Sequence, residues 1–116
     1  VNMVNITVMK GFADGNGAGF CFTGAAMGKI SNSSFINNIA SNGGGGIMMI
    51  GGTNITVENV NFELNEALLG AGIFIGDHAK PLISYSTFSN CLAKTGGGGL
   101  LITAYSQPTI YQTEIS

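Results

Sequence analysis

Short apolar segments recur along the chain, and each follows a run of glycine and other small residues. Segments of this kind begin at Phe20, Ile47, Ile73 and Leu100. Other segments alternate apolar and polar residues, as in Ile55-Thr-Val57. Alternation of this kind indicates strands, and no stretch of ten or more residues has the spacing of an amphipathic helix. The pattern therefore predicts an all-β chain.

The segments repeat at a nearly constant interval. The glycines that directly precede the four apolar segments are spaced by 27, 26 and 27 residues. A large apolar residue upstream of each glycine cluster recurs with spacings of 27, 27, 26 and 27, and five residues after the first four of these landmarks there is always an alanine. The landmarks are Val8, Phe35, Phe62, Phe88 and Ile115, and the alanines are Ala13, Ala40, Ala67 and Ala93.

A repeat of about 27 residues made of short strands and Gly/Asn corners is typical of a parallel β-solenoid, in which one repeat forms one coil. We therefore expect residues 1–116 to form a single β-solenoid domain of about four coils. The landmark residues would form an apolar column inside the coils, and the alanines a narrower column where a larger side chain would overpack. Glycines suit corners that need positive φ, and asparagines of equal phase, such as Asn38 and Asn65, could form amide ladders along the axis.

The composition describes a folded chain with few charges. Only 9% of the residues are charged, against about 25% in a typical soluble domain. Four Lys and no Arg give a formal net charge of -2, so no nucleic-acid partner is expected, because phosphate binding needs clustered cations. The longest apolar runs, such as Ile47–Ile50, fall far short of the roughly 20 residues that a membrane span requires, so no membrane span is expected either.

Two successive repeats share a motif in which Phe-x-x-Asn precedes a glycine cluster and an isoleucine. It reads Phe35-Ile-Asn-Asn38 with Gly44-Gly-Gly-Ile47, and Phe62-Glu-Leu-Asn65 with Gly70-Ala-Gly-Ile73. The motif resembles the repeat of the chlamydial polymorphic outer membrane proteins and, more broadly, the right-handed parallel β-helices of the pectin-lyase-like class. The resemblance covers essentially the whole chain, with Cys91 in place of the asparagine in the fourth repeat. It implies a right-handed β-helix located outside the cell or on its surface, and it specifies the fold far better than the function.

The carboxylates do not suggest a catalytic site. Enzymes that resemble this fold and act on polysaccharides place acidic residues on one face of adjacent coils. Here Glu58, Glu63 and Glu66 fall within one coil, and no neighbouring coil has a carboxylate at the same phase. We therefore expect no catalytic residues. Asp77-His78 is interpreted as a solvated turn, and because one His and two Cys do not make a usual zinc ligand set, neither a metal nor another cofactor is expected.

The two cysteines fall in the first and fourth coils. Cys21 and Cys91 would lie about three strand spacings apart along the axis, or roughly 14 Å. Because a disulfide tolerates Cα separations of up to about 7 Å, no bridge within the chain is expected. Two free thiols, or bonds to other chains, remain as alternatives.

Three N-glycosylation sequons begin at Asn5, Asn32 and Asn54. Three is barely more than this composition gives by chance. Glycans at Asn5 and Asn32, which share one phase, would lie in a line and could supply the solubility that a surface with few charges lacks. If these two side chains instead point inward as a ladder, they are not available for glycosylation.

The strand after each glycine cluster is apolar on both of its faces. One set of residues must line the interior, so the other would form an exposed stripe on the outside. Such a stripe is either a lateral interface or a surface buried by a neighbouring domain. The stripe consists of Cys21, Met48, Phe74 and Leu101, to which Leu68 and Leu69 add from a nearby loop.

The first and last nine residues occupy the same phase of the coil and both have the pattern of strands. Open sheet edges pair with other strands. We therefore expect a non-catalytic structural protein whose partner is itself, stacked end to end and also laterally in an extracellular or surface fibre, with glycans as a further possibility. The alternatives are an excerpt of a long surface adhesin or autotransporter passenger domain and, third, a β-helix enzyme acting on polysaccharides.

Overall fold

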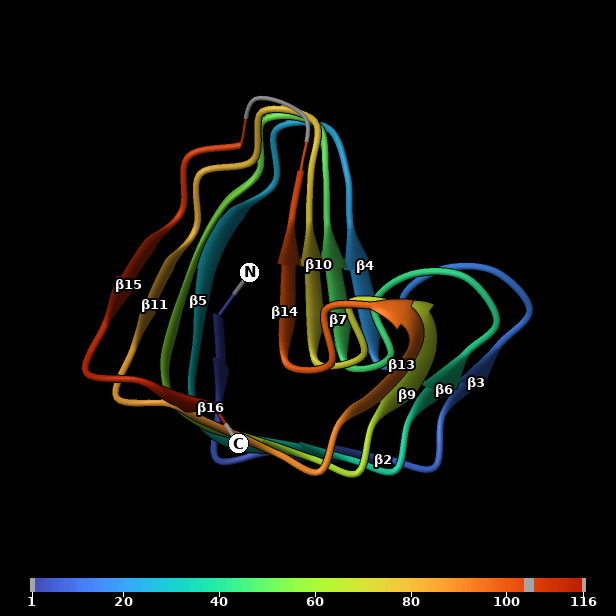
Figure 1. The fold of residues 1–116 in the computed structure, drawn as a ribbon. Helices are drawn as coiled ribbons and strands as arrows, with labels where there is room; N and C mark the ends of the chain where they lie inside the picture. The colour runs from blue at the N-terminus through green and yellow to red at the C-terminus, as the bar shows by residue number, and fades with distance from the viewer. Residues whose placement is uncertain (1, 104–105, 116) are drawn as a thin grey trace.

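A computed structural model describes residues 2–103 and 106–115 of the chain (Figure 1). In this part of the chain there are strands and no helices, as the sequence pattern predicts. Three parallel sheets, named A, B and C here, run along the axis of a solenoid (Figure 1). Sheet C contains β4 (Phe20–Phe22), β7 (Ile47–Met49), β10 (Ile73–Ile75) and β14 (Leu100–Ile102), and sheet B contains β3 (Phe12–Ala13), β6 (Ile39–Ala40), β9 (Glu66–Leu69) and β13 (Leu92–Gly96).

Sheet A is the largest of the three. It bends so that its first half faces sheet C and its second half forms the base of the coil (Figure 1). In the second and third coils one long strand covers both halves, whereas in the other coils two short strands do so. Sheet A contains β1 (Asn2–Val4), β2 (Thr7–Met9), β5 (Met27–Ile36), β8 (Asn54–Glu63), β11 (Leu82–Ser84), β12 (Thr87–Ser89), β15 (Thr109–Tyr111) and β16 (Glu114–Ile115).

The strands pair in the register that the repeat predicts. Phe20 pairs with Ile47, Ile47 with Ile73 and Ile73 with Leu100. All the pairs are parallel, so each coil lies on the next with residues of equal phase in contact. The expectation of an all-β parallel solenoid of about four coils is confirmed.

The interior contains a column of aromatic rings. Phe35, Phe62 and Phe88 are buried, and their rings stack with centroid separations of 5.2 and 4.5 Å and interplanar angles of 11° and 2°. Val8 packs against this core as a partly buried residue, and Ile115, in the last layer, pairs with Phe88 but is half exposed. Parallel stacking of identical side chains thus provides much of the core, with ring contacts each contributing about 0.5–1.5 kcal/mol beyond burial.

The alanine column lies in a second, narrower core. Ala40 and Ala67 in sheet B pack with Ala71 of the glycine corner, and Ala13 and Ala93 are partly buried beside them. The corner approaches the sheet closely, because a Cβ added to the buried Gly45 would lie 2.6 Å from the carbonyl oxygen of Glu66. The backbones of the corner and of the sheet are therefore so close together that only small side chains fit between them.

Two corners of the coil are formed by residues with left-handed backbone. One, within sheet A, has φ between 48° and 57° in every coil, and the other, between sheets A and B, has φ between 52° and 56°. None of these residues is glycine, and left-handed φ is uncommon for other residues. The first corner is formed by Asn5, Asn32, Asn59, Tyr85 and Gln112, and the second by Lys10, Asn37, Leu64 and Asn90.

Candidate functional site

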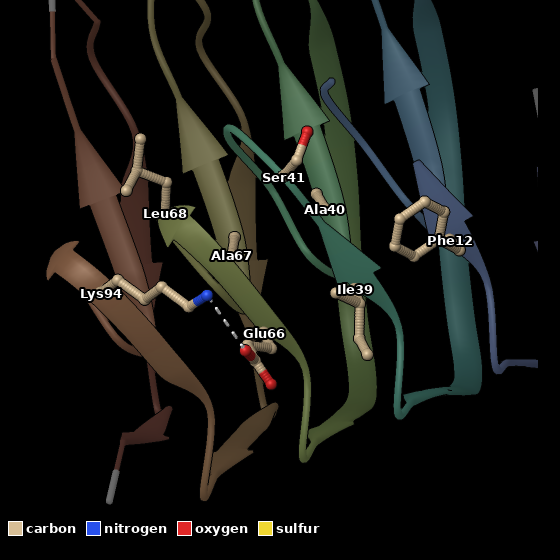
Figure 2. Close-up of a pocket in the computed structure, with 8 residues that line it drawn as sticks. All are labelled: Phe12, Ile39, Ala40, Ser41, Glu66, Ala67, Leu68 and Lys94. Atoms are coloured by element: carbon tan, nitrogen blue, oxygen red, sulfur yellow. Dashed lines mark ion pairs between the residues drawn. The ribbon is translucent and has the colours of Figure 1, made fainter. Parts of the chain in front are cut away.

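A shallow groove of about 210 Å³ crosses the outer face of sheet B (Figure 2). Side chains alternate between the two faces of a strand, so the inward alanines leave their sequence neighbours on the outside. The groove spans all four strands of the sheet. Its lining residues are Phe12, Ile39, Ala40, Ser41, Glu66, Ala67, Leu68 and Lys94.

The groove is mainly apolar but carries both signs of charge. The ammonium group of Lys94 lies 3.9 Å from a carboxylate oxygen of Glu66 (Figure 2). At one end of the same face the hydroxyl of Ser41 donates to Asp14 at 3.3 Å. Both contacts are solvent-exposed, and exposed ion pairs typically contribute about 0–1 kcal/mol. These charged groups therefore remain available to bind another molecule.

This face was not among the sites expected from the sequence. Its signal was present in the repeat, because the neighbours of the inward alanines must point outward, and three of the four residues that precede them are large and apolar: Phe12, Ile39 and Leu92. The repeat alone does not show that these positions form a groove, since that depends on how sheet B is set apart from sheet C by the glycine corner (Figure 1).

The expected lateral stripe on sheet C is corrected in part. Cys21, Met48, Phe74 and Leu101 do form one column, but Met48 is only 7% exposed, and Phe74 and Leu101 are partly buried. The cause is the glycine corner, which folds over the stripe within each coil. A Cβ added to Gly44, whose φ is 70°, would lie 2.8 Å from the Cβ of Met48. Of the two loop residues in the expected interface, Leu68 is exposed on the groove and Leu69 is partly buried.

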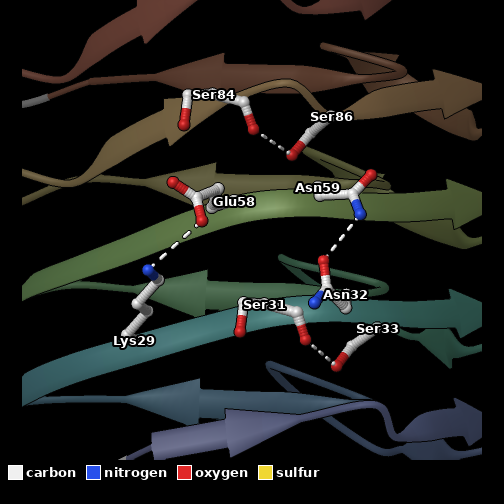
Figure 3. A network of polar contacts seen from close by, with 8 residues as sticks. All are labelled: Lys29, Ser31, Asn32, Ser33, Glu58, Asn59, Ser84 and Ser86. Atoms are coloured by element: carbon white, nitrogen blue, oxygen red, sulfur yellow. Dashed lines mark hydrogen bonds and ion pairs between the residues drawn. The ribbon is translucent and has the colours of Figure 1, made fainter.

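The carboxylates lie on different faces of the solenoid. Glu58, on the outer face of sheet A, forms an ion pair with Lys29 at 3.2 Å (Figure 3). Glu66 lies in the groove on sheet B, and Asp77 lies 3.3 Å from His78 in an exposed turn. Within residues 2–103 and 106–115, no group of three or more His, Cys, Asp or Glu side chains is arranged to hold a metal ion.

Polar residues at the left-handed corner of sheet A, some exposed and some buried, stabilise the bend of that sheet. The amide of Asn59 donates to the amide oxygen of Asn32 at 2.6 Å, across the left-handed corner (Figure 3). The hydroxyls of Ser33 and Ser86 each donate to a backbone carbonyl two residues earlier, at 2.8 and 3.0 Å (Figure 3). Ser86 also accepts the backbone N–H of Val60 at 3.2 Å, so these polar groups satisfy the backbone where strand pairing is interrupted.

The three sequon asparagines are all exposed. Asn5 and Asn32 lie at the left-handed corner of sheet A, and Asn54 is the first residue of β8. The first two therefore do not form an inward ladder, although Asn32 accepts the hydrogen bond from Asn59.

Both cysteines are free thiols, with Cys21 exposed and Cys91 partly buried. Burial raises the pKa of both thiols. At Cys91 this effect exceeds that of the backbone and side-chain N–H groups of Asn65, which donate toward the sulfur and act to lower the pKa. Over the described residues, no helix has the length and apolarity to cross a membrane.

Comparison with known proteins identifies the architecture. A family model described as a right-handed β-helix region matches residues 1–116. No curated protein and no solved structure matches the chain significantly.

Proposed function

We propose that this chain, which belongs to the right-handed β-helix family, is a non-catalytic structural β-helix whose end rungs pair with further β-helix rungs. A second copy of the chain stacked end to end, as in a fibre, is the partner we favour. Head-to-tail contacts that do not close into a ring produce such fibres.

The exposed ends of the interior columns carry this proposal. The buried column of Ile30, Val57 and Ile83 continues into Ile110, which is 41% exposed, and the aromatic column continues into Ile115, which is 50% exposed. These side chains have the inward phase of the coil and lie uncovered in the last layer. Another rung stacked on this end would bury these apolar side chains. It would also pair the backbone groups of the last strands, which otherwise form an open sheet edge.

Two charge substitutions on one strand test the stacking. Ile110→Lys places an ammonium group at the inward phase of β15, which should block a further rung, because inward-pointing charges prevent edge pairing. Thr109→Lys adds the same charge to the neighbouring, outward phase and should leave stacking unchanged. Electron microscopy and sedimentation of the purified chain should show elongated particles for the wild type and Thr109→Lys, and short ones for Ile110→Lys. Wild-type protein that remains monomeric at all concentrations would reject stacking of separate copies.

A location outside the cell or on its surface belongs to the same proposal. The exposed sequons at Asn5, Asn32 and Asn54 and the low content of charged residues support it, since glycans would add solubility. Secretion from a glycosylating host followed by enzymatic deglycosylation should lower the apparent mass. An Asn54→Gln variant should lose one glycan, and an unchanged mass in the wild type would reject glycosylation.

A segment of a long surface adhesin is the second candidate. It is supported by the Phe-x-x-Asn motif, whose members Phe35, Asn38, Phe62 and Asn65 are all buried at the base of the coil. The intact mass of the natural polypeptide distinguishes the two candidates: about 12 kDa plus glycans favours separate subunits, and a much larger mass favours a segment. Cleavage of a polysaccharide by the purified chain would instead support the enzyme alternative.

A further inference from the structure

The outer face of sheet B presents two parallel columns of side chains. One column is formed by the residues that precede the inward alanines: Phe12, Ile39, Glu66 and Leu92. Phe12 and Leu92, at the two ends of this column, are 74% and 59% exposed. Ile39, which pairs with Phe12 in the next coil, is 41% exposed, so the first two coils present adjacent apolar side chains on this face. Contiguous exposed apolar side chains mark contact surfaces.

The second column is formed by the residues that follow the alanines. It begins with Asp14 in the first coil, continues through Ser41 and Leu68, and ends with Lys94 in the fourth coil. Asp14 therefore places a negative charge at one end of the face. Lys94 places a positive charge at the other end, where it also lies 3.9 Å from the carboxylate of Glu66 in the first column. Asp14 and Lys94 are three coils apart, so they do not pair with each other within one chain.

The two ends of this face are complementary under a twofold rotation. Consider a twofold axis that lies in the plane of the contact, runs parallel to the strands and passes between the second and third coils. Rotation about this axis reverses the order of the coils, so the first coil of one chain faces the fourth coil of the other. Each column then faces the same column of the second chain. Asp14 of one chain then faces Lys94 of the other, in two equivalent contacts. The same rotation places Phe12 opposite Leu92, again twice, and in the two inner coils it sets Ile39 against Glu66 and Ser41 against Leu68. The complementarity therefore lies in the outer coils, where opposite charges face each other and apolar side chains face each other.

We infer that the outer face of sheet B pairs with the same face of a second copy, with the two solenoid axes antiparallel. Closed pairing of one patch with itself is the usual geometry of homodimers. The alternative twofold axis, along the solenoid, would keep the coils in order but place one column over the other. It would set Phe12 against Asp14, Leu68 against Glu66 and Leu92 against Lys94. Three apolar side chains of each chain would then face charged groups, whereas the first axis leaves only Ile39 facing one.

The lateral pairing does not depend on end-to-end stacking, because it uses a different surface. One face of four coils is small, so we expect a weak dimer for a single chain. In a longer solenoid or a stack of chains, several such faces lie along one side. Once one face has paired, the neighbouring faces are held close to their partners, so the effective concentration for their pairing rises. Lateral pairing would then bundle neighbouring solenoids.

Charge reversal tests the pairing. The experiment uses the Ile110→Lys background, in which the ends are blocked, and sedimentation equilibrium over a series of concentrations at low salt. The parent should dimerise, whereas Asp14→Lys and Lys94→Asp should each be monomeric, because like charges then face one another in both contacts. A 1:1 mixture of the two variants should form a heterodimer, since in both of its contacts a lysine of one variant faces an aspartate of the other.

Matched controls separate this effect from net charge and from folding. Lys29→Asp on sheet A and Asp77→Lys in the exposed turn change the net charge by the same amounts and should leave dimerisation unchanged. Circular dichroism should show that all variants keep their strands, and the recovery in the mixture itself requires two folded partners. A parent that stays monomeric, or a mixture that does not recover association, overturns the inference. If the two control substitutions abolish the dimer equally, the contact is not specific to sheet B and the inference is also wrong.

Discussion

The side-chain amide of Asn38 donates a hydrogen bond to the side-chain oxygen of Asn65, 3.0 Å away in the next coil. The backbone N–H of Asn38 donates to the same oxygen, also at 3.0 Å, and both residues are fully buried. They follow the left-handed corner formed by Asn37 and Leu64, where the strands of sheets A and B do not provide a backbone acceptor. The asparagine ladder thus satisfies the donors of a buried corner.

Replacing Asn65 by alanine should destabilise the protein. The substitution removes the acceptor of two buried donors on Asn38, and a buried donor without a partner costs about 1–3 kcal/mol. Urea denaturation should show this loss in the free energy of unfolding. Asn61→Ala is the control. Asn61 lies in the same coil as Asn65 but accepts an exposed hydrogen bond from Thr87 of the next coil, so its loss should change stability by no more than about 0.5 kcal/mol. Equal losses in the two variants would contradict a special role for the ladder.

Cys91 occupies the next position of the ladder and makes weaker contacts there. Its sulfur lies 3.9 Å from the donating amide of Asn65 and 3.7 Å from the carbonyl oxygen of Phe62. The amide nitrogen of Asn65 makes the equivalent contact with Phe35 at 2.8 Å. Cys91→Asn should therefore stabilise the protein by about 0.5–1.5 kcal/mol, the net value of a typical hydrogen bond. A lower midpoint of urea denaturation in the variant would show that an amide does not fit this site.

The same cysteine should make stability depend on pH in alkaline solution. Burial raises the pKa of the Cys91 thiol in the folded state above the value of about 8.5 of an unfolded cysteine. The folded chain then keeps this proton to higher pH than the unfolded chain does. Its stabilising contribution is complete below about pH 8.5 and is lost as the pH rises through the folded pKa. As the pH rises above about 8.5, the wild type should lose more free energy of unfolding than Cys91→Asn, and parallel curves would contradict this.

Gly46 should not tolerate a side chain. A Cβ at this position would lie 2.6 Å from the carbonyl oxygen of Gly72 in the next coil and 3.0 Å from the ring of Phe62. Gly46→Ala should destabilise the protein by about 1–3 kcal/mol, as measured by thermal or urea denaturation. Gly96 is the control within another glycine cluster, because the nearest atom to a Cβ added there, a methyl group of Leu69, is 3.9 Å away. Gly96→Ala should be close to neutral.

Ala67 should likewise resist enlargement. It is 1% exposed and lies in the narrow core between sheet B and the glycine corner. Ala67→Leu should lower the free energy of unfolding by about 1–3 kcal/mol, since the corner must move to accommodate it. Leu68→Ala, on the exposed side of the same strand, should have a much smaller effect. Stability equal to the wild type in Ala67→Leu would show that the narrow core is not closely packed.

The repeat was sufficient to predict the strands, their parallel register and the inward phase of Phe35, Phe62 and Phe88, because identical phases must stack in a solenoid. It was not sufficient to predict which residues at the corners adopt left-handed backbone. Asparagine and glycine signal left-handed backbone, but Leu64 and Tyr85 do not, and their conformation is imposed by the coils on either side.

The surface was the least predictable part. Alternation along a strand shows which side chains point outward, but not what lies over them. The burial of Met48 depends on the path of the glycine corner, and the exposure of Phe12 reflects that no described segment lies over it on the outer face of sheet B. Both are properties of how the segments are folded together in each coil rather than of any single segment.

The inter-coil hydrogen bonds of the side chains join residues only 26 to 30 positions apart. Each coil therefore contacts its immediate neighbours, and the structure is held together as a chain of adjacent pairs. Unfolding should begin by fraying of the outermost coils and proceed inward in steps. Excision of one complete 27-residue unit, for example residues 36–62, would bring Phe35 next to the following repeat and leave the remaining coils in phase. The length of such a protein should therefore be able to change without loss of its fold.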